Sequence, residues 1–187
     1  WNHYQSIIHL IALIHITIMN ISKIDPWVDP APSNANTMKL SKLRQQIKKK
    51  KPWAYRQMAK RYQDGIPGVD EKQSMQKIVD NYQKGIKLGD PICMHEHGYR
   101  CMIGSGMAEN GHDKKTSGLS ASNKKKVIKL AFIHYEMAAL KGYDRSQCSL
   151  GNCYRYGVGV KQSDSKAREW YNRAAAQDNK EAIENLR

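Results

Sequence analysis

Cysteine and histidine side chains gather between residues 93 and 101, where their types suggest a metal site. Cys93, His97 and Cys101 are spaced four residues apart, so they share one face if this segment is helical. Thiolate and imidazole are ligands that Zn²⁺ prefers. However, three ligands along two helical turns span about 12 Å, so they cannot all reach one ion. We therefore expect these side chains to be packed, and we predict neither a metal site nor a cofactor.

A serine followed three residues later by a lysine, as in some hydrolases, occurs three times. The pairs are Ser74/Lys77, Ser122/Lys125 and Ser163/Lys166. The companion motifs Ser-Asp-Asn and Lys-Thr-Gly are missing. The sequence also has no P-loop, no dinucleotide-binding glycine motif after a strand and no Gly-x-Ser-x-Gly elbow. We therefore predict that the protein is not an enzyme and has no catalytic residues.

The basic residues of the chain, whose net charge is +14, are concentrated in one segment. Ten of them, and no acid, lie between Lys39 and Arg61: Lys39, Lys42, Arg44, Lys48, Lys49, Lys50, Lys51, Arg56, Lys60 and Arg61. Such a run is typical of a solvated arm or a short transport signal, and it can also bind anions. No aromatic residue interrupts it between Lys39 and Lys51, so no base-stacking platform is expected there. Electrostatic binding of nucleic acid or anionic membrane through residues 39–61 is the alternative function.

The N-terminal part differs in composition from the rest of the chain. Residues 1–24 are apolar, with no charged side chain before Lys23, and predict a membrane anchor, a signal or a non-native extension. Residues 25–37 form a Pro/Asn linker, which makes the N-terminal segment mobile. The sequence does not decide the compartment. A cytoplasmic or nuclear location is favoured, whereas a membrane-anchored or secretory-pathway location is expected if residues 1–22 are authentic. The default for Cys93, Cys101, Cys148 and Cys153 is the free thiol.

A helical pattern recurs at residues 53–65, 92–104 and 145–157. In each segment a larger residue is followed directly by a small residue. A second position of the pattern lies four residues after the larger residue, and a glycine lies three residues after that second position. These sets are Met58, Tyr62 and Gly65; His97, Cys101 and Gly104; and Leu150, Tyr154 and Gly157. Offsets of four residues form one stripe of an α-helix, and glycine fits the turn that follows it.

A second helix follows each turn, at residues 77–86, 130–139 and 166–175. Each carries a small or apolar residue, a tyrosine four positions later (Tyr82, Tyr135 or Tyr171), and then two small or apolar residues. Tyr135 and Tyr171 are 36 residues apart, whereas His97 and Leu150 are 53 apart. The surplus of 17 residues predicts a loop insert at about 108–124. The chain is therefore expected to consist of stacked helical hairpins.

The third hairpin, residues 148–179, resembles a Sel1-like repeat, whose pattern is roughly A-x-x-x-L-G-x-x-Y-x-x-G-x-G-V, then K-A, W/Y-Y and A-A. The first two hairpins depart from this pattern, because Met58-Ala59 and His97-Gly98 replace Leu-Gly and Cys101 replaces Tyr. The resemblance implies an all-α fold, an α/α superhelical solenoid of about three hairpins related to tetratricopeptide arrays. Residues 38–51 are expected to be a basic capping helix or a free basic helix. Residues 52–187 hold the repeats, at 52–90, 91–144 and 145–180, with a further helix beginning at 181–187.

The resemblance also implies a scaffold or adaptor that brings proteins together and binds a partner on the concave face of the solenoid. The basic character of that face favours an acidic peptide or helix as the partner. The residues expected to point at it are Arg56, Lys60, Gln63, His95, Tyr99, Met102, Asn152 and Arg155. The residues expected to build the repeats are Met58, Tyr62, Gly65, Gly68, Tyr82, His97, Gly98, Gly104, Gly106, Ala131, Tyr135, Ala138, Ala139, Leu150, Gly151, Tyr154, Gly157, Gly159, Ala167, Tyr171, Ala174 and Ala175.

Overall fold

The computed structural model describes residues 31–66, 71–104 and 120–187, and its regular elements within these ranges are all α-helices. They are α2 (Leu40–Lys48), α3 (Pro52–Gln63), α4 (Glu71–Lys87), α5 (Pro91–Gly104), α6 (Ala121–Leu140), α7 (Asp144–Tyr156), α8 (Asp164–Ala175) and α9 (Lys180–Asn185). None of these helices is both long enough and apolar enough to cross a membrane. The predicted apolar segment 1–24, residues 25–30 of the linker and the glycines at 68 and 106 lie outside the described residues.

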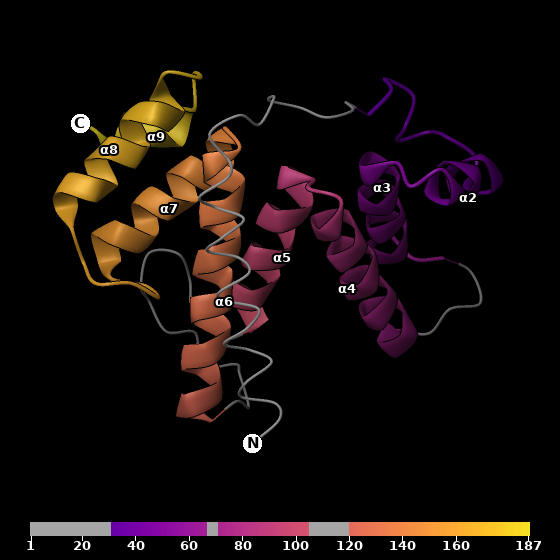
Figure 1. Ribbon diagram of the computed structural model, residues 1–187, viewed down its shortest axis with the longest axis horizontal. Helices are drawn as coiled ribbons and strands as arrows, with labels where there is room; N and C mark the ends of the chain where they lie inside the picture. Colours follow the sequence, from indigo (N-terminus) through magenta and orange to yellow (C-terminus); the bar gives the residue numbers. More distant parts are fainter. Residues whose placement is uncertain (1–30, 67–70, 105–119) are drawn as a thin grey trace.

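The helices form three hairpins that stack in chain order. The pairs α3–α4, α5–α6 and α7–α8 make the most extensive contacts, and α4–α5 and α6–α7 join one hairpin to the next (Figure 1). Short connections, such as residues 157–163 between α7 and α8, favour antiparallel packing of neighbouring helices. The predicted all-α solenoid of about three helical hairpins is therefore confirmed.

Local sequence signals set the helix ends. Ser120, Ser163 and Asn179 cap α6, α8 and α9, because each side-chain oxygen accepts a hydrogen bond from a backbone N–H three residues on. Gly157 ends α7 in the left-handed conformation, with φ of 68°, which costs glycine little. Because the cap at Ser120 starts α6 at Ala121, the last four residues of the predicted loop insert are helical, and residues 105–119 lie outside the described ranges.

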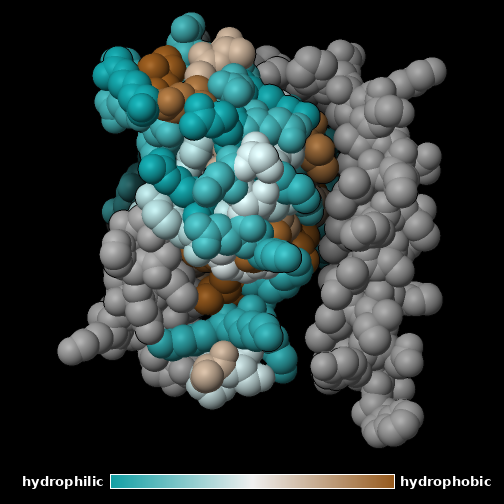
Figure 2. Space-filling view, turned by 90° about the vertical axis from the view of Figure 1, so that its left-hand side faces the viewer, coloured by the Kyte–Doolittle hydropathy of each residue, from teal (hydrophilic) through white to brown (hydrophobic). Residues whose placement is uncertain are grey.

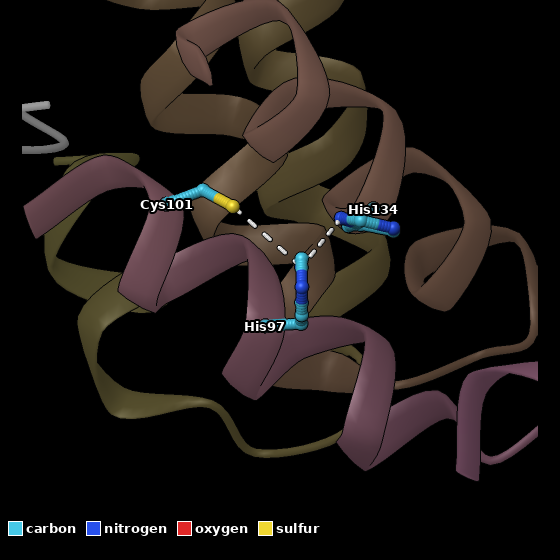
Figure 3. Close-up of side chains that lie close together, drawn as sticks. All are labelled: His97, Cys101 and His134. Carbon is cyan, nitrogen blue, oxygen red and sulfur yellow. Dashed lines mark hydrogen bonds between the residues drawn. The ribbon is translucent and has the colours of Figure 1, made fainter. Parts of the chain in front are cut away.

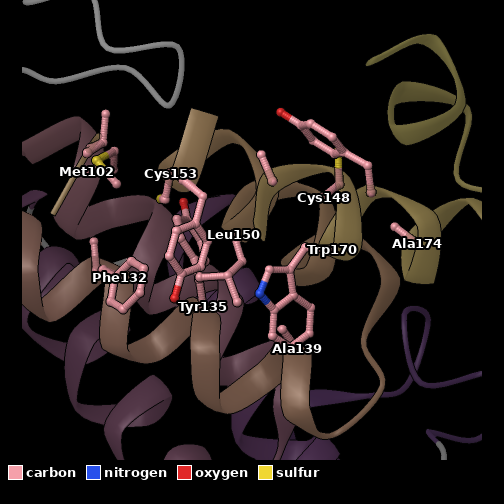
Figure 4. Packing of buried hydrophobic residues seen from close by; sticks show 14 of the residues in the cluster. Met102, Phe132, Tyr135, Ala139, Cys148, Leu150, Cys153, Trp170 and Ala174 are labelled. Atoms are coloured by element: carbon pink, nitrogen blue, oxygen red, sulfur yellow. The ribbon is translucent and has the colours of Figure 1, made fainter. Parts of the chain in front are cut away.

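The largest buried cluster joins α5 and α6 to the third hairpin (Figure 4). Tyr135 and Leu150 are fully buried, and Phe132 packs edge-to-face on Tyr154 with ring centroids 5.7 Å apart. Small residues let the helices approach: a Cβ at Gly98 would lie 3.1 Å from the backbone oxygen of Ala131. The structure thus buries large side chains of one helix over small residues of its partner.

The basic segment folds as an amphipathic helix on the first hairpin. Leu43 of α2 is fully buried and clusters with Trp53 and Met58 of α3. The basic side chains that are exposed around it are Lys39, Lys42, Arg44, Lys48, Lys49 and Lys50. Arg61, in contrast, donates through Nη2 to the backbone oxygens of Asn36 and Met38, at 2.6 and 2.9 Å. Arg61 therefore secures the chain that leads into α2.

Candidate functional site

The first helices of the hairpins, α3, α5 and α7, carry the residues expected to contact a partner. Lys60, Gln63, Tyr99 and Arg155 are exposed. Tyr99 is 45% exposed, and Ile103, one turn further along α5, is 49% exposed. Tyr156 of α7, at the position equivalent to Ile103, is 44% exposed, and the guanidinium of Arg155 lies 5.8 Å from its ring centroid. We call Lys60, Tyr99, Ile103, Arg155 and Tyr156 the first-helix face.

His95, Met102 and Asn152 are buried, so the expectation that they point at a partner was wrong. Met102 is 1% exposed and belongs to the cluster formed with α6, α7 and α8. The side chain of Asn152 accepts a hydrogen bond from the Tyr171 hydroxyl at 2.6 Å. The physical reason is that a first helix inside a stack packs both against its own second helix and against the next hairpin.

Arg56 is partly buried and forms an ion pair within the fold instead of presenting its side chain to a partner. Its Nη1 lies 3.1 Å from both carboxylate oxygens of Asp90, whose side chain is 5% exposed. Oδ1 of Asp90 in turn accepts hydrogen bonds from the backbone N–H groups of Ile92 and Cys93, at 2.9 and 3.0 Å. Asp90 therefore caps α5 and ties it to α3.

His95 occupies the position equivalent to Arg56 in the second hairpin. Its Nδ1 lies 3.0 Å from the Ser146 hydroxyl, and its ring packs on Tyr143 with centroids 5.3 Å apart. Burial, helped by Arg145, lowers the pKa of His95 to about 4. The imidazole is therefore neutral near pH 7 and acts as a packing group between hairpins. The repeat alignment relates the two residues, because Arg56 lies two residues before Met58 and His95 lies two residues before His97.

The serine–lysine pair at the start of α8 has a structural explanation. Ser163 is the N-cap, and its hydroxyl accepts a hydrogen bond from the backbone N–H of Lys166 at 3.4 Å. The ammonium of Lys166 lies 5.3 Å from the centroid of the Tyr154 ring instead of approaching the serine. This pair therefore gives no activated nucleophile.

The cysteines of α5 lie in two different environments. The sulfur of Cys93 fills the space that a side chain at Gly85 would occupy, and burial raises its pKa well above the usual value. Burial raises the pKa of the Cys101 thiol to about 11. Neither thiol has the lowered pKa of a reactive cysteine. His134 of α6 lies beside His97 and Cys101, a neighbour that residue spacing along α5 does not predict.

Comparisons with known proteins agree with this architecture. The Sel1 repeat family model matches residues 118–143 and 144–179. A crystal structure of a Sel1 repeat protein from Oxalobacter formigenes is similar, with a TM-score of 0.61 and 26% identity, over 79% of this chain and 96% of that one. The chain is a Sel1-like repeat protein. The prediction from the third hairpin is confirmed.

Two further similar proteins match this chain over only part of their own length. A protective antigen of uropathogenic Escherichia coli strains displaying an SLR fold has a TM-score of 0.60 and 23% identity, over 78% of this chain and 27% of that one. Chitin synthase regulatory factor 3 of Schizosaccharomyces pombe is 39% identical over 66 residues, which are 35% of this chain and 6% of that protein. This Sel1-like repeat protein therefore spans a small part of the regulatory factor it matches.

The family matches cover the second helix of the second hairpin and the whole third hairpin. The structure adds α3–α4, a helical pair of the same kind, on the N-terminal side. Viewed from the end with α8 and α9, the described surface is mainly hydrophilic with small hydrophobic patches (Figure 2). Sel1 repeats generally mediate protein–protein interaction, and this Sel1-like array has the architecture for that role.

Proposed function

We propose that this protein is a non-enzymatic adaptor that binds a partner protein on the first-helix face, the concave face of the predicted solenoid. The observation that carries the proposal is the exposure of Ile103 and Tyr156 at corresponding positions of α5 and α7, with exposed Tyr99 one turn before Ile103 on α5. Tyrosine is enriched among residues that dominate binding energy, and exposed apolar groups on a folded surface favour association. The likeness to a regulatory factor supports an adaptor role.

The charges beside these side chains indicate the chemistry of the partner. Arg155 is exposed next to Tyr156 on α7, and Lys60 is exposed on α3, the first helix of the first hairpin. An acidic peptide or helix that also offers apolar side chains complements such a face, because the cations steer it and the aromatic rings provide buried area. We therefore propose an acidic, amphipathic segment as the partner.

Affinity capture followed by quantitative mass spectrometry tests this surface. The triple variant Lys60→Glu, Tyr99→Ala and Arg155→Glu is expected to recover at least about tenfold less of each direct partner than the wild-type chain, because removal of hot-spot contacts costs about 2 kcal/mol or more. All three side chains are exposed, so the fold is expected to stay intact.

The matched control changes the second helices instead. Lys84→Glu, Leu130→Ala and Arg168→Glu make the same number of charge reversals and one truncation at exposed positions of α4, α6 and α8. This control is expected to recover partners as the wild type does. Equal recovery by the first-helix variant and the wild type would contradict the proposed surface.

A second candidate function rests on α2. The apolar stripe of α2 is buried against α3. The exposed basic side chains of α2 therefore lie together on the solvent side of this one helix. An amphipathic basic helix anchored in this way can bind the phosphates of nucleic acid or the headgroups of an anionic membrane.

Salt dependence decides this second candidate. If Lys42, Arg44 and Lys48 contact phosphates, the affinity for a DNA duplex should fall with a log–log slope of about −0.9 for each contact. Changing these three residues to alanine should then make the slope shallower by about 3. Anionic vesicles in place of the duplex identify a membrane surface. Absence of binding to both at low ionic strength would leave α2 a structural helix.

A further inference from the structure

His97, Cys101 and His134 converge between the two helices of the second hairpin. His97 and Cys101 lie one turn apart on α5, and His134 faces them from α6 (Figure 3). One possible ligand atom from each of the three residues lies within 4.8 Å of the other two. The cluster therefore differs from the single-helix set considered in the sequence, since its third member comes from the partner helix.

The spacing of these atoms matches the edges of a tetrahedral metal site. His97 Nδ1 lies 3.2 Å from His134 Nδ1 and 3.6 Å from Cys101 Sγ. Zinc bonds of about 2.0–2.1 Å to nitrogen and 2.3 Å to sulfur place two nitrogens about 3.3 Å apart, and nitrogen and sulfur about 3.6 Å apart, in tetrahedral geometry. Two of the three edges of the cluster thus have the lengths of a tetrahedral site, and the third is no longer than 4.8 Å.

Hydrogen bonding leaves one of the two contacts at His97 Nδ1 weak. His97 Nδ1 is the common partner of His134 Nδ1 and Cys101 Sγ. A neutral imidazole nitrogen carries either one proton or one lone pair in the ring plane, so it makes one good hydrogen bond rather than two. A bound cation would instead use the lone pairs of all three groups at once.

The other two hairpins show that packing does not require these residue types. The positions equivalent to His97, Cys101 and His134 hold Met58, Tyr62 and Asn81 in the first hairpin, and Leu150, Tyr154 and Trp170 in the third. Three departures from the repeat therefore coincide at one point in space. Each of them introduces a nitrogen or sulfur donor suited to borderline-soft metal ions.

We propose that His97, Cys101 and His134 bind a Zn²⁺ ion that links α5 to α6, with the fourth coordination position open to water. His97 is 8% exposed, and Cys101 and His134 are half-buried, so an ion can reach the cluster from solvent. Cys101 binds as the thiolate and releases its proton to water. Tyr99 and Ile103 lie on the same helix, so the ion would stiffen the segment that carries them.

Metal titration of the full chain, without a polyhistidine tag and kept reduced, tests the proposal. The metal-free protein is expected to bind one Zn²⁺ per chain in competition with a chromophoric chelator, and Co²⁺ is expected to give the visible bands of a tetrahedral site with a thiolate ligand. His97→Leu, Cys101→Ala and His134→Asn should each weaken Zn²⁺ binding by at least about 100-fold, since even indirect support of a ligand is worth 10–100-fold.

Controls separate this site from other donors and from misfolding. Cys93→Ala removes a thiol of the same helix outside the cluster and should bind Zn²⁺ as the wild type does. His97→Leu installs the residue type that the third hairpin carries, so circular dichroism should show unchanged helix content, while Zn²⁺ should raise the thermal midpoint of the wild type only. Wild-type affinity in all three ligand variants, or no saturable binding by the wild type, would overturn the proposal. Partner capture is not involved, so this outcome is independent of the proposed function.

Discussion

Asp90→Ala is expected to lower the free energy of unfolding by about 4 kcal/mol. The buried carboxylate accepts hydrogen bonds from Arg56 and from two backbone N–H groups at the start of α5. Loss of an N-cap costs about 1–2 kcal/mol, and breaking a buried ion pair costs about 3–5 kcal/mol because one charge stays behind without its partner. Arg56 is 18% exposed and so recovers part of its hydration, which favours the middle of this range. Denaturant unfolding followed by circular dichroism measures the change.

Asp90→Asn divides this effect into its two parts. The amide oxygen can still accept from the backbone of Ile92 and Cys93, whereas the negative charge opposite Arg56 is lost. We expect a loss of about 2–3 kcal/mol, which is the loss for alanine without the contribution of the cap. Asp164→Ala is the control, since Asp164 is an exposed acid in the first turn of α8 and should contribute less than about 1 kcal/mol. Equal effects of alanine and asparagine at position 90 would show that the cap contributes nothing.

The repeat architecture could be predicted from the sequence because it depends on the spacing of residues within each hairpin. Offsets of four residues, as between Leu150 and Tyr154, define a helical stripe whatever the neighbours are. Small residues such as Gly98 lie where the second helix comes closest. Each hairpin carries this information within itself, so the number of hairpins and their order follow without knowledge of long-range contacts.

The candidate binding site was predicted less well because exposure depends on how the hairpins stack. Met102 and Gln63 occupy equivalent positions, yet Met102 is buried and Gln63 is exposed. The stacking angle that decides this is not contained in the periodicity of a single helix. His134 could not be predicted for a related reason. Spacing along α5 relates residues of one helix, whereas the donor that completes the cluster lies 33 residues beyond Cys101, on α6.

Gly151→Val is expected to destabilise the protein by about 3 kcal/mol. A Cβ at this position would lie 2.5 Å from Cε1 and 2.6 Å from Cδ1 of Tyr171. The ring cannot move away easily, since Tyr171 is 2% exposed and its hydroxyl donates to Asn152 at 2.6 Å. Overpacking of a close contact costs about 1–3 kcal/mol or more. The better helix propensity of valine, compared with glycine, offsets only a few tenths of a kcal/mol of this cost. Thermal and denaturant unfolding measure the loss.

A double-mutant cycle tests whether the Tyr171 ring is the cause. With Tyr171→Leu in place the ring atoms nearest residue 151 are gone, so Gly151→Val should then cost less than about 1 kcal/mol, a coupling of about 2 kcal/mol. Asn172→Val, at an exposed position of α8, should change stability by less than about 0.5 kcal/mol. If Gly151→Val costs as much in the Tyr171→Leu background as in the wild-type chain, the close approach of α7 to α8 at this glycine is not what limits the side chain there.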